Sequence, residues 1–121
     1  MADGGAPLRR YAQIEQFDFH HRLAEAPGVS LIFFSRPACG SCQRWAVLLQ
    51  EFLKQRLDIR ILEVNAERDP ALIEEFEVFH LPALFIYKDG EYFGQLQGEA
   101  RLDALSQGIE SALRGGPQDP P

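Results

Sequence analysis

Cysteine is scarce in this chain of 121 residues, which contains two. Both lie in one four-residue segment, Cys39-Gly40-Ser41-Cys42. A bridge between such near neighbours closes a very small loop and removes little entropy from the unfolded chain. The pair is therefore not the disulfide framework of a small secreted domain, which leaves reactivity or metal binding as its function.

The sequence also lacks a long hydrophobic run and an excess of positive charge. No stretch approaches the roughly 18 consecutive apolar residues that span a bilayer, and residues 1–10 contain no apolar segment typical of an export signal. The 12 Lys and Arg against 18 Asp and Glu give a formal net charge of -6, which repels a phosphate backbone. We therefore expect a cytoplasmic protein that binds neither membranes nor nucleic acid.

The length of the chain fits one compact domain. Gly, Ala and Pro are frequent in residues 1–10, and Gly and Pro recur in residues 115–121, so both ends are predicted to be flexible tails. No repeat, low-complexity run or break in composition divides the part between them. The sequence predicts a single domain over residues 11–114.

Hydrophobic patterns in the first half of this domain predict a strand, a helix and a second strand. Residues 29–35 form a nearly continuous apolar run, typical of a strand buried on both faces of a mostly parallel sheet. Residues 59–65 resume strand character. Between them, apolar residues recur at helical spacing, namely Trp45, Leu48, Leu49, Phe52 and Leu53. This order predicts a parallel βαβ crossover that carries the cysteines at the carboxyl end of a central strand.

The second half predicts a short helix and then a hairpin. Asp69 followed by Pro70 is typical of an N-cap and a first helical position, so we expect a short helix from Pro70 that ends before the next proline. Residues 83–87 and 92–96 are strand-like and flank Asp89-Gly90, which suits a two-residue hairpin turn. The hairpin adds antiparallel strands to the sheet.

The two ends of the domain complete the predicted α/β architecture. Residues 11–14 are interpreted as an edge strand, and residues 17–26 as a helix with Phe17, Phe19 and Leu23 partly buried. A last amphipathic helix stops at Gly115-Gly116, and its apolar stripe consists of Leu102, Leu105, Ile109, Ala112 and Leu113. The expected fold is a central mixed sheet with a βαβ N-terminal half and a C-terminal β-hairpin plus helix.

Cys39 is predicted to be an attacking nucleophile. A free thiol has a pKa of about 8.5 and is mostly protonated at neutral pH. A helix that begins just after Cys39 directs unpaired backbone N–H groups and the positive end of its dipole at the sulfur, which favours the thiolate. Ser41 contributes a backbone N–H and a hydroxyl as further donors. Cys42, one helical turn on, is then placed to resolve a mixed disulfide.

A metal site is the alternative interpretation of the cysteine pair. Zinc requires four ligands, and no second cysteine pair supplies them. Two thiolates still suffice to bind Cu(I), as a metallochaperone does. His20 and His21 have no further ligands near them in sequence and are interpreted as exposed polar surface. We therefore predict no metal and no organic cofactor.

The segments Ala38–Cys42, Leu81-Pro82, Lys88-Asp89-Gly90 and Gly98, in this order, resemble the thioredoxin family. The resemblance covers roughly residues 11–114 and implies a thioredoxin fold with the activity of a protein disulfide oxidoreductase. It also implies a cis peptide bond before Pro82, with Leu81 and Pro82 pairing with the backbone of a bound substrate. The implied partners are disulfide-containing client proteins and a flavin-containing, NADPH-dependent thioredoxin reductase, within electron transport and cell redox homeostasis. We expect a monomer.

Four positions depart from the pattern of that family. Ala38 and Ser41 stand where thioredoxins usually have tryptophan and proline. Phe33, six residues before the first cysteine, occupies the place of a buried aspartate, and Glu63 occupies that of a nearby lysine. The usual proton acceptor for Cys42 is thus missing. Glu63, on the neighbouring strand, is our candidate to replace it.

A second candidate for proton transfer is His80, two residues before Pro82, because an imidazole titrates near neutral pH. The departures at Phe33 and Glu63 leave open a non-catalytic binding or chaperone module on the same fold. The two retained cysteines favour the enzyme over that module. The Cu(I) metallochaperone stays open as a further alternative.

Overall fold

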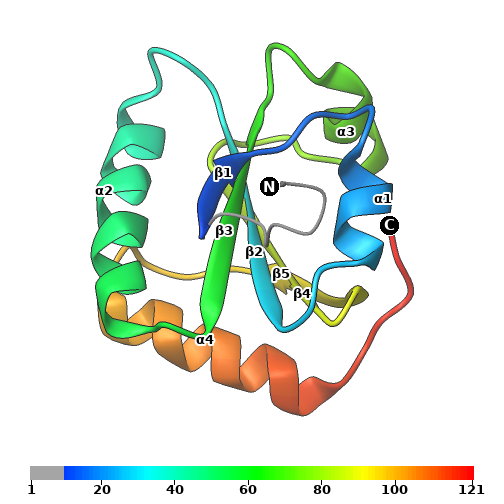
Figure 1. Cartoon of the computed structure of the whole chain (residues 1–121). Coiled ribbons are helices and arrows are strands. Elements are labelled where there is room, and N and C mark those ends of the chain that lie inside the picture. Colours follow the sequence, from blue (N-terminus) through cyan, green and yellow to red (C-terminus); the bar gives the residue numbers. More distant parts are fainter. Residues whose placement is uncertain (1–9) are drawn as a thin grey trace, which may run out of the picture.

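The computed structural model describes residues 10–121, and its order of elements agrees with the predicted one (Figure 1). The first half contains a βαβ unit after a short strand and helix, and the second half contains a helix, a hairpin and a last helix. The elements are β1 (Tyr11–Gln13), α1 (Phe19–Ala24), β2 (Val29–Ser35), α2 (Gly40–Gln55), β3 (Ile59–Asn65), α3 (Pro70–Glu75), β4 (Ala83–Lys88), β5 (Glu91–Leu96) and α4 (Leu102–Gly115).

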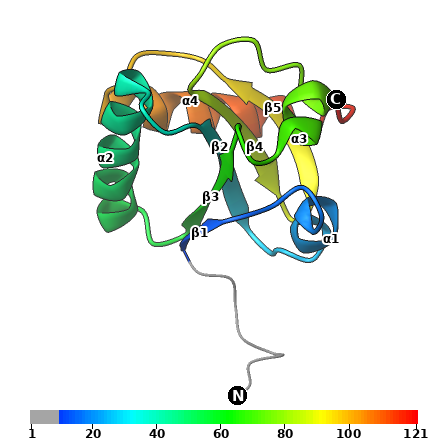
Figure 2. The ribbon, with the colours of Figure 1, turned by 90° about the horizontal axis from the view of Figure 1, so that it is seen from above.

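The five strands form one mixed sheet in the order β1-β3-β2-β4-β5. Strands β1 and β2 run parallel to β3, whereas β4 runs antiparallel to both β2 and β5. Every residue of β2 is buried, because this central strand is flanked by strands at both edges and covered on both faces. Its continuous apolar sequence follows from that position. Figure 2 shows α2 and α3 on opposite sides of the sheet.

Two hydrophobic clusters fill the space between the sheet and its helices. Because side chains alternate along a strand, Leu31 and Phe33 of β2 face α2 and α4, whereas Ile32 and Phe34 face the side of α1 and α3. All four side chains are fully buried. The phenyl ring of Phe33 therefore packs in the core against α2. It occupies the position of the buried aspartate in the family pattern.

The hairpin turn is confirmed at Asp89-Gly90. Both residues have positive φ, 53° and 82° respectively, as a two-residue turn of type I′ requires. Gly90 has a second reason to be glycine, since a Cβ there would come within 2.9 Å of the carbonyl oxygen of Ala24. The turn therefore packs closely against the end of α1.

The start of α3 is capped differently from our prediction. Asp69 is the residue before the helix, but its side chain makes no cap hydrogen bond. Instead its buried carboxylate accepts hydrogen bonds from the Arg68 guanidinium at 2.8 Å and the Gln16 backbone N–H at 3.2 Å. The Gln16 side chain provides the cap, because its Oε1 accepts from the backbone N–H of Ala71 at 3.0 Å.

The predicted helix over residues 17–26 is shorter, as α1 spans Phe19–Ala24. Phe19 and Leu23 are buried as predicted. The prediction for Phe17 was wrong, because this residue precedes the helix and its side chain is 87% exposed. None of the helices among residues 10–121 is long and apolar enough to cross a membrane.

The chain after α4 runs along the sheet. Helix α4 ends at the predicted Gly115-Gly116 stop, and the backbone N–H of Gln118 then donates to the carbonyl of Tyr92 on β5 at 2.8 Å. The Gln118 side chain lies over Gly94, where a Cβ would meet it at 2.8 Å. Flexibility of residues 115–121 stays a prediction, and that of residues 1–10 concerns mostly residues outside the described part of the chain.

Candidate active site

The cysteine pair and Pro82 lie at the same end of the sheet. Strand β2 ends at Ser35, and Cys39 is the N-cap residue of α2. The antiparallel register pairs Phe34 with Ala83, which places Pro82 beside the start of the loop that carries the cysteines. The Leu81–Pro82 peptide bond is cis, as the family resemblance implied.

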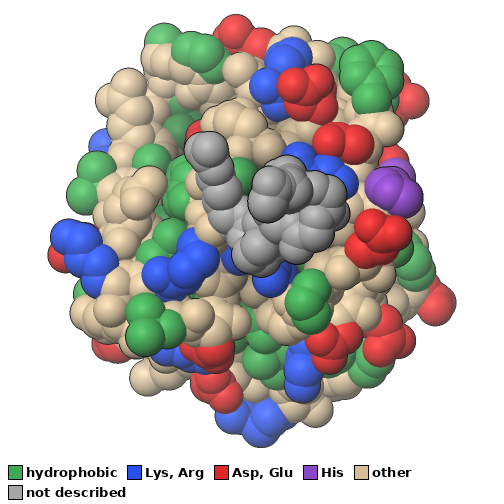
Figure 3. All heavy atoms as spheres, in the orientation of Figure 1, with side chains coloured by type: hydrophobic (Ala, Val, Ile, Leu, Met, Phe, Trp, Pro, Cys, Tyr) green, Lys and Arg blue, Asp and Glu red, His purple; other side chains and the backbone are tan. Residues whose placement is uncertain are grey.

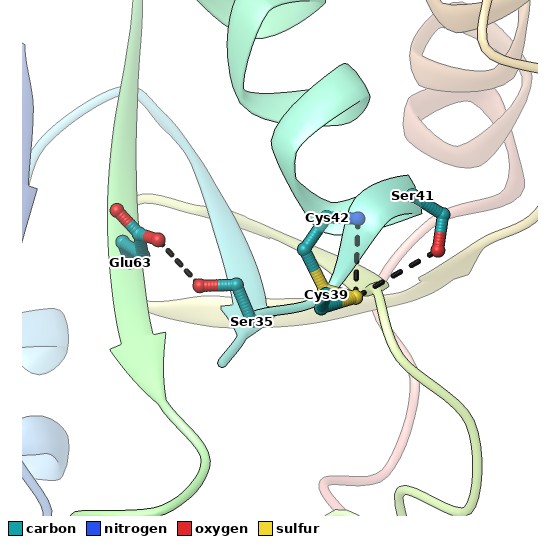
Figure 4. The surroundings of a disulfide bond; sticks show 5 residues. All are labelled: Ser35, Cys39, Ser41, Cys42 and Glu63. Atoms are coloured by element: carbon teal, nitrogen blue, oxygen red, sulfur yellow. Dashed lines mark hydrogen bonds between the residues drawn. A yellow bond between two sulfur atoms is a disulfide. The ribbon is translucent and has the colours of Figure 1, made fainter. Parts of the chain in front are cut away.

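Cys39 and Cys42 form a disulfide, with their Cα atoms 5.1 Å apart. Both side chains are buried, and Cys39 is the more exposed of the two, at 7% against 3%. The backbone N–H of Cys42 donates to the Cys39 sulfur at 3.2 Å, and the hydroxyl of Ser41 lies 3.7 Å from the same sulfur (Figure 4). A disulfide sulfur carries no proton, so Ser41 is the donor. Both donors converge on the sulfur predicted to carry the negative charge.

Glu63 lies on β3, two residues before the strand ends, and is held by side chains from two other strands. Its carboxylate accepts hydrogen bonds from the Tyr11 hydroxyl and the Gln13 amide, each at 3.1 Å, and from the Ser35 hydroxyl. Burial raises the pKa of Tyr11, and the neighbouring Glu63 carboxylate raises it further. Tyr11 therefore remains a protonated donor to Glu63 across the neutral range.

The Ser35 hydroxyl points toward Glu63 and away from the sulfur atoms (Figure 4). Ser35, Glu63 and Gln43 help to line a hollow of about 240 Å³. Because Gln43 directly follows Cys42, this hollow reaches the first turn of α2. It exceeds the roughly 30 Å³ share of a single water and is bordered by the Glu63 carboxylate, so it can hold water beside that group.

The three histidines do not gather at the cysteines. His80 is exposed on the segment between α3 and β4, and its proton-transfer role stays a prediction. His20 pairs with Glu75 at 2.8 Å, and His21 lies 3.7 Å from Glu25. Within residues 10–121, no group of three or more His, Cys, Asp and Glu side chains is arranged to hold a metal ion.

A cysteine pair at the start of a helix, beside a cis-proline on a mixed α/β sheet, is the arrangement typical of thiol-disulfide oxidoreductases. The chain belongs to the thioredoxin family, whose family model, described as Thioredoxin, matches residues 10–111.

The chain is also similar to individual proteins that carry the name thioredoxin. The chain is 30% identical over 111 residues to "Thioredoxin Y, chloroplastic" of Oryza sativa, covering 90% of this chain and 66% of the rice protein. It therefore spans just under two thirds of that relative. It is 26% identical to "Thioredoxin 1" of Nostoc sp., with 84% and 96% covered. The solved structure of oxidized mitochondrial thioredoxin 3 from Saccharomyces cerevisiae is similar in fold, with a TM-score of 0.73, 24% identity and coverage of 84% of this chain and 94% of the yeast chain.

Proposed function

We propose that this protein reduces or exchanges disulfide bonds in client proteins. The Cys39 thiolate attacks one client sulfur, forms a mixed disulfide and releases the other client sulfur as a thiolate. Cys42, deprotonated, then attacks the Cys39 sulfur, which releases the second client thiol and forms the Cys39–Cys42 disulfide. Two electrons pass from the dithiol to the client. The observation that carries the proposal is the donation from the Cys42 N–H to the Cys39 sulfur at the start of α2.

The client chain is proposed to lie across Leu81 and Pro82. Pro82 is half-buried and adjoins the loop that carries the cysteines, and an extended peptide can pair with backbone groups there. A client disulfide placed at that edge of the sheet brings its sulfur to Cys39.

We propose that the protein acts in cell redox homeostasis in the cytoplasm. The reducing conditions there convert the Cys39–Cys42 disulfide back to the dithiol. An NADPH-dependent thioredoxin reductase is the proposed electron donor, and the thioredoxin names of the relatives support it. We also propose that the protein acts as a monomer. On the face drawn in Figure 3, acidic and basic side chains are interspersed, a distribution that favours protein clients over a nucleic acid.

Insulin reduction tests this function. With dithiothreitol as electron source, catalytic amounts of the protein are expected to accelerate insulin reduction well above dithiothreitol alone, as measured by turbidity. Protein whose two thiols have been alkylated is the control and should add nothing to the background. Equal rates with and without the unmodified protein would refute the proposal. Titration against glutathione then separates a reductase, with a strongly reducing potential, from an oxidase or isomerase.

We further propose that Glu63 takes up the proton of Cys42 during resolution, through water in the hollow that Glu63 borders together with Gln43, the residue after Cys42. The Ser35 hydroxyl donates to Glu63 and not to a cysteine sulfur. In the disulfide state Ser35 therefore does not bridge the carboxylate and Cys42, so the proposed proton transfer runs through water. Three hydrogen-bond donors fix the carboxylate at that place. The hollow has room for water beside the carboxylate and extends to Gln43 in the first turn of α2.

Replacing Glu63 by glutamine is expected to slow resolution of the mixed disulfide several-fold and to flatten its dependence on pH, because the amide cannot accept the proton. Rapid-quench measurement of the resolution rate between pH 5 and 9 checks this. Glu67→Gln is the matched control, since Glu67 is exposed, and it should behave as the unmodified protein. An unchanged rate and pH profile in Glu63→Gln would remove the proton-transfer role.

A further inference from the structure

A hollow of about 200 Å³ lies beside Pro82, away from the Glu63 side of the site. Four elements enclose it, and the exposed residues Gln95, Gln97 and Glu99 form part of its border. Its apolar walls come from Trp45 of α2, Pro82 and Leu84 around the start of β4, Leu96 of β5, and Leu105 of α4. The reaction described above makes no use of this space.

The hollow is open because α4 carries a glycine in its interior. Gly108 lines the hollow, although glycine is an unfavourable residue in a helix interior. Its backbone does not require glycine, since its φ is outside the positive range. A Cβ at Gly108 would meet its nearest neighbour, a methyl of Leu96, at 3.9 Å. There is therefore room for a side chain that the sequence does not place there.

The position of the hollow connects it to the reactive pair. Pro82 forms one wall and adjoins the cysteine loop through the register of β2 and β4. Trp45, another wall, lies one helical turn after Cys42 on α2. A polypeptide whose sulfur reaches Cys39 across Pro82 thus carries its flanking residues over the mouth of this hollow.

Size and lining together indicate what fits. The volume is below the range of about 300–1,000 Å³ for sites that take drug-sized ligands, and it suits one side chain. Leu84 and Leu105 are apolar but only 4% exposed, so the apolar surface open to a ligand comes mainly from the half-buried Trp45, Pro82 and Leu96. We propose that the hollow binds one large apolar side chain, such as leucine, methionine or phenylalanine, next to the reactive cysteine of the client. This inference rests on the proposed function and gives it a substrate preference.

Two disulfide-linked peptides test the preference. They differ in one residue beside the reactive cysteine, which is leucine in one and alanine in the other. The unmodified protein is expected to show a KM about tenfold lower for the leucine peptide, the order of discrimination that apolar pockets reach. Gly108→Leu fills the hollow from within and is expected to bring the ratio of the two KM values close to one.

Gly115→Leu is the matched control, because Gly115 lies in the last turn of the same helix and a Cβ there meets nothing within 4 Å. It should keep the tenfold ratio. Equal KM values for the two peptides with the unmodified protein would overturn the inference without any variant, and so would a full preference in folded Gly108→Leu. Failure to reduce either peptide or hydroxyethyl disulfide would instead refute the proposed function, and this inference with it.

Discussion

Replacing Cys39 by serine is expected to reduce insulin reduction to the dithiothreitol background. Cys39 is the N-cap residue of α2, whereas Cys42, the other cysteine, lies inside the first turn and is less exposed. A serine hydroxyl is a far weaker nucleophile than a thiolate and forms no disulfide. Turbidity or loss of insulin disulfides measures the effect. Substantial remaining activity would show that Cys39 is not the attacking group.

The same substitution three residues on should give a different result. Cys42→Ser keeps the attacking thiol and the backbone N–H that donates to it, so the first step proceeds. Without a resolving thiol, the mixed disulfide accumulates and turnover stops. Mass spectrometry should then detect one client molecule attached to Cys39, whereas Cys39→Ser should capture none. Capture by Cys39→Ser would reverse the two roles.

Phe76→Ala is expected to destabilise the fold by about 3–5 kcal/mol, the usual loss for removing a buried phenyl ring. Phe76 is 5% exposed, and its ring lies at the centre of an aromatic cluster. The centroid distances are 4.9 Å to Phe85, 5.4 Å to both Phe19 and Phe34, and 6.4 Å to Tyr92. These rings come from α1, β2, β4 and β5, so one truncation loosens contacts among several elements. Urea unfolding of the reduced protein measures the loss.

Phe79→Ala provides the control for that variant, because it removes the same side chain from a position three residues on. Phe79 is 83% exposed, and its truncation should change the free energy of unfolding by less than about 0.5 kcal/mol. A comparable loss in both variants would show that the aromatic cluster does not account for the stability assigned to it.

Much of the fold could be predicted because the decisive signals are local. The buried run of residues 29–35 and the Asp89-Gly90 turn each specify one element without reference to distant parts of the chain. The cap of α3 could not be predicted in the same way. It depends on Gln16, which is 55 residues from its partner Ala71 and comes close only after the chain has folded. Because Arg68 binds the Asp69 carboxylate, the capping hydrogen bond to the start of α3 comes from Gln16 instead.

The candidate site shows the same division. Cys39, Cys42 and Pro82 could be identified from short motifs, and Glu63 from its place on the second strand of the crossover. The hydrogen-bond donors around Glu63 could not be predicted from the sequence, because they lie on two other strands and no motif links them. Ser35 was visible only as a polar residue ending an apolar strand. Gly108 gave no signal beyond being an unfavourable residue for a helix.

The two outer strands of the sheet leave few backbone groups free to pair with another polypeptide chain. On one side β1 contains three residues, and on the other the Tyr92 carbonyl of β5 already accepts from Gln118. Unpaired strand edges are where other chains add edge to edge, through backbone hydrogen bonds, to form aggregates and fibrils. The short β1 and the Gln118 contact on β5 therefore reduce the length of free strand edge at which this sheet could recruit another chain.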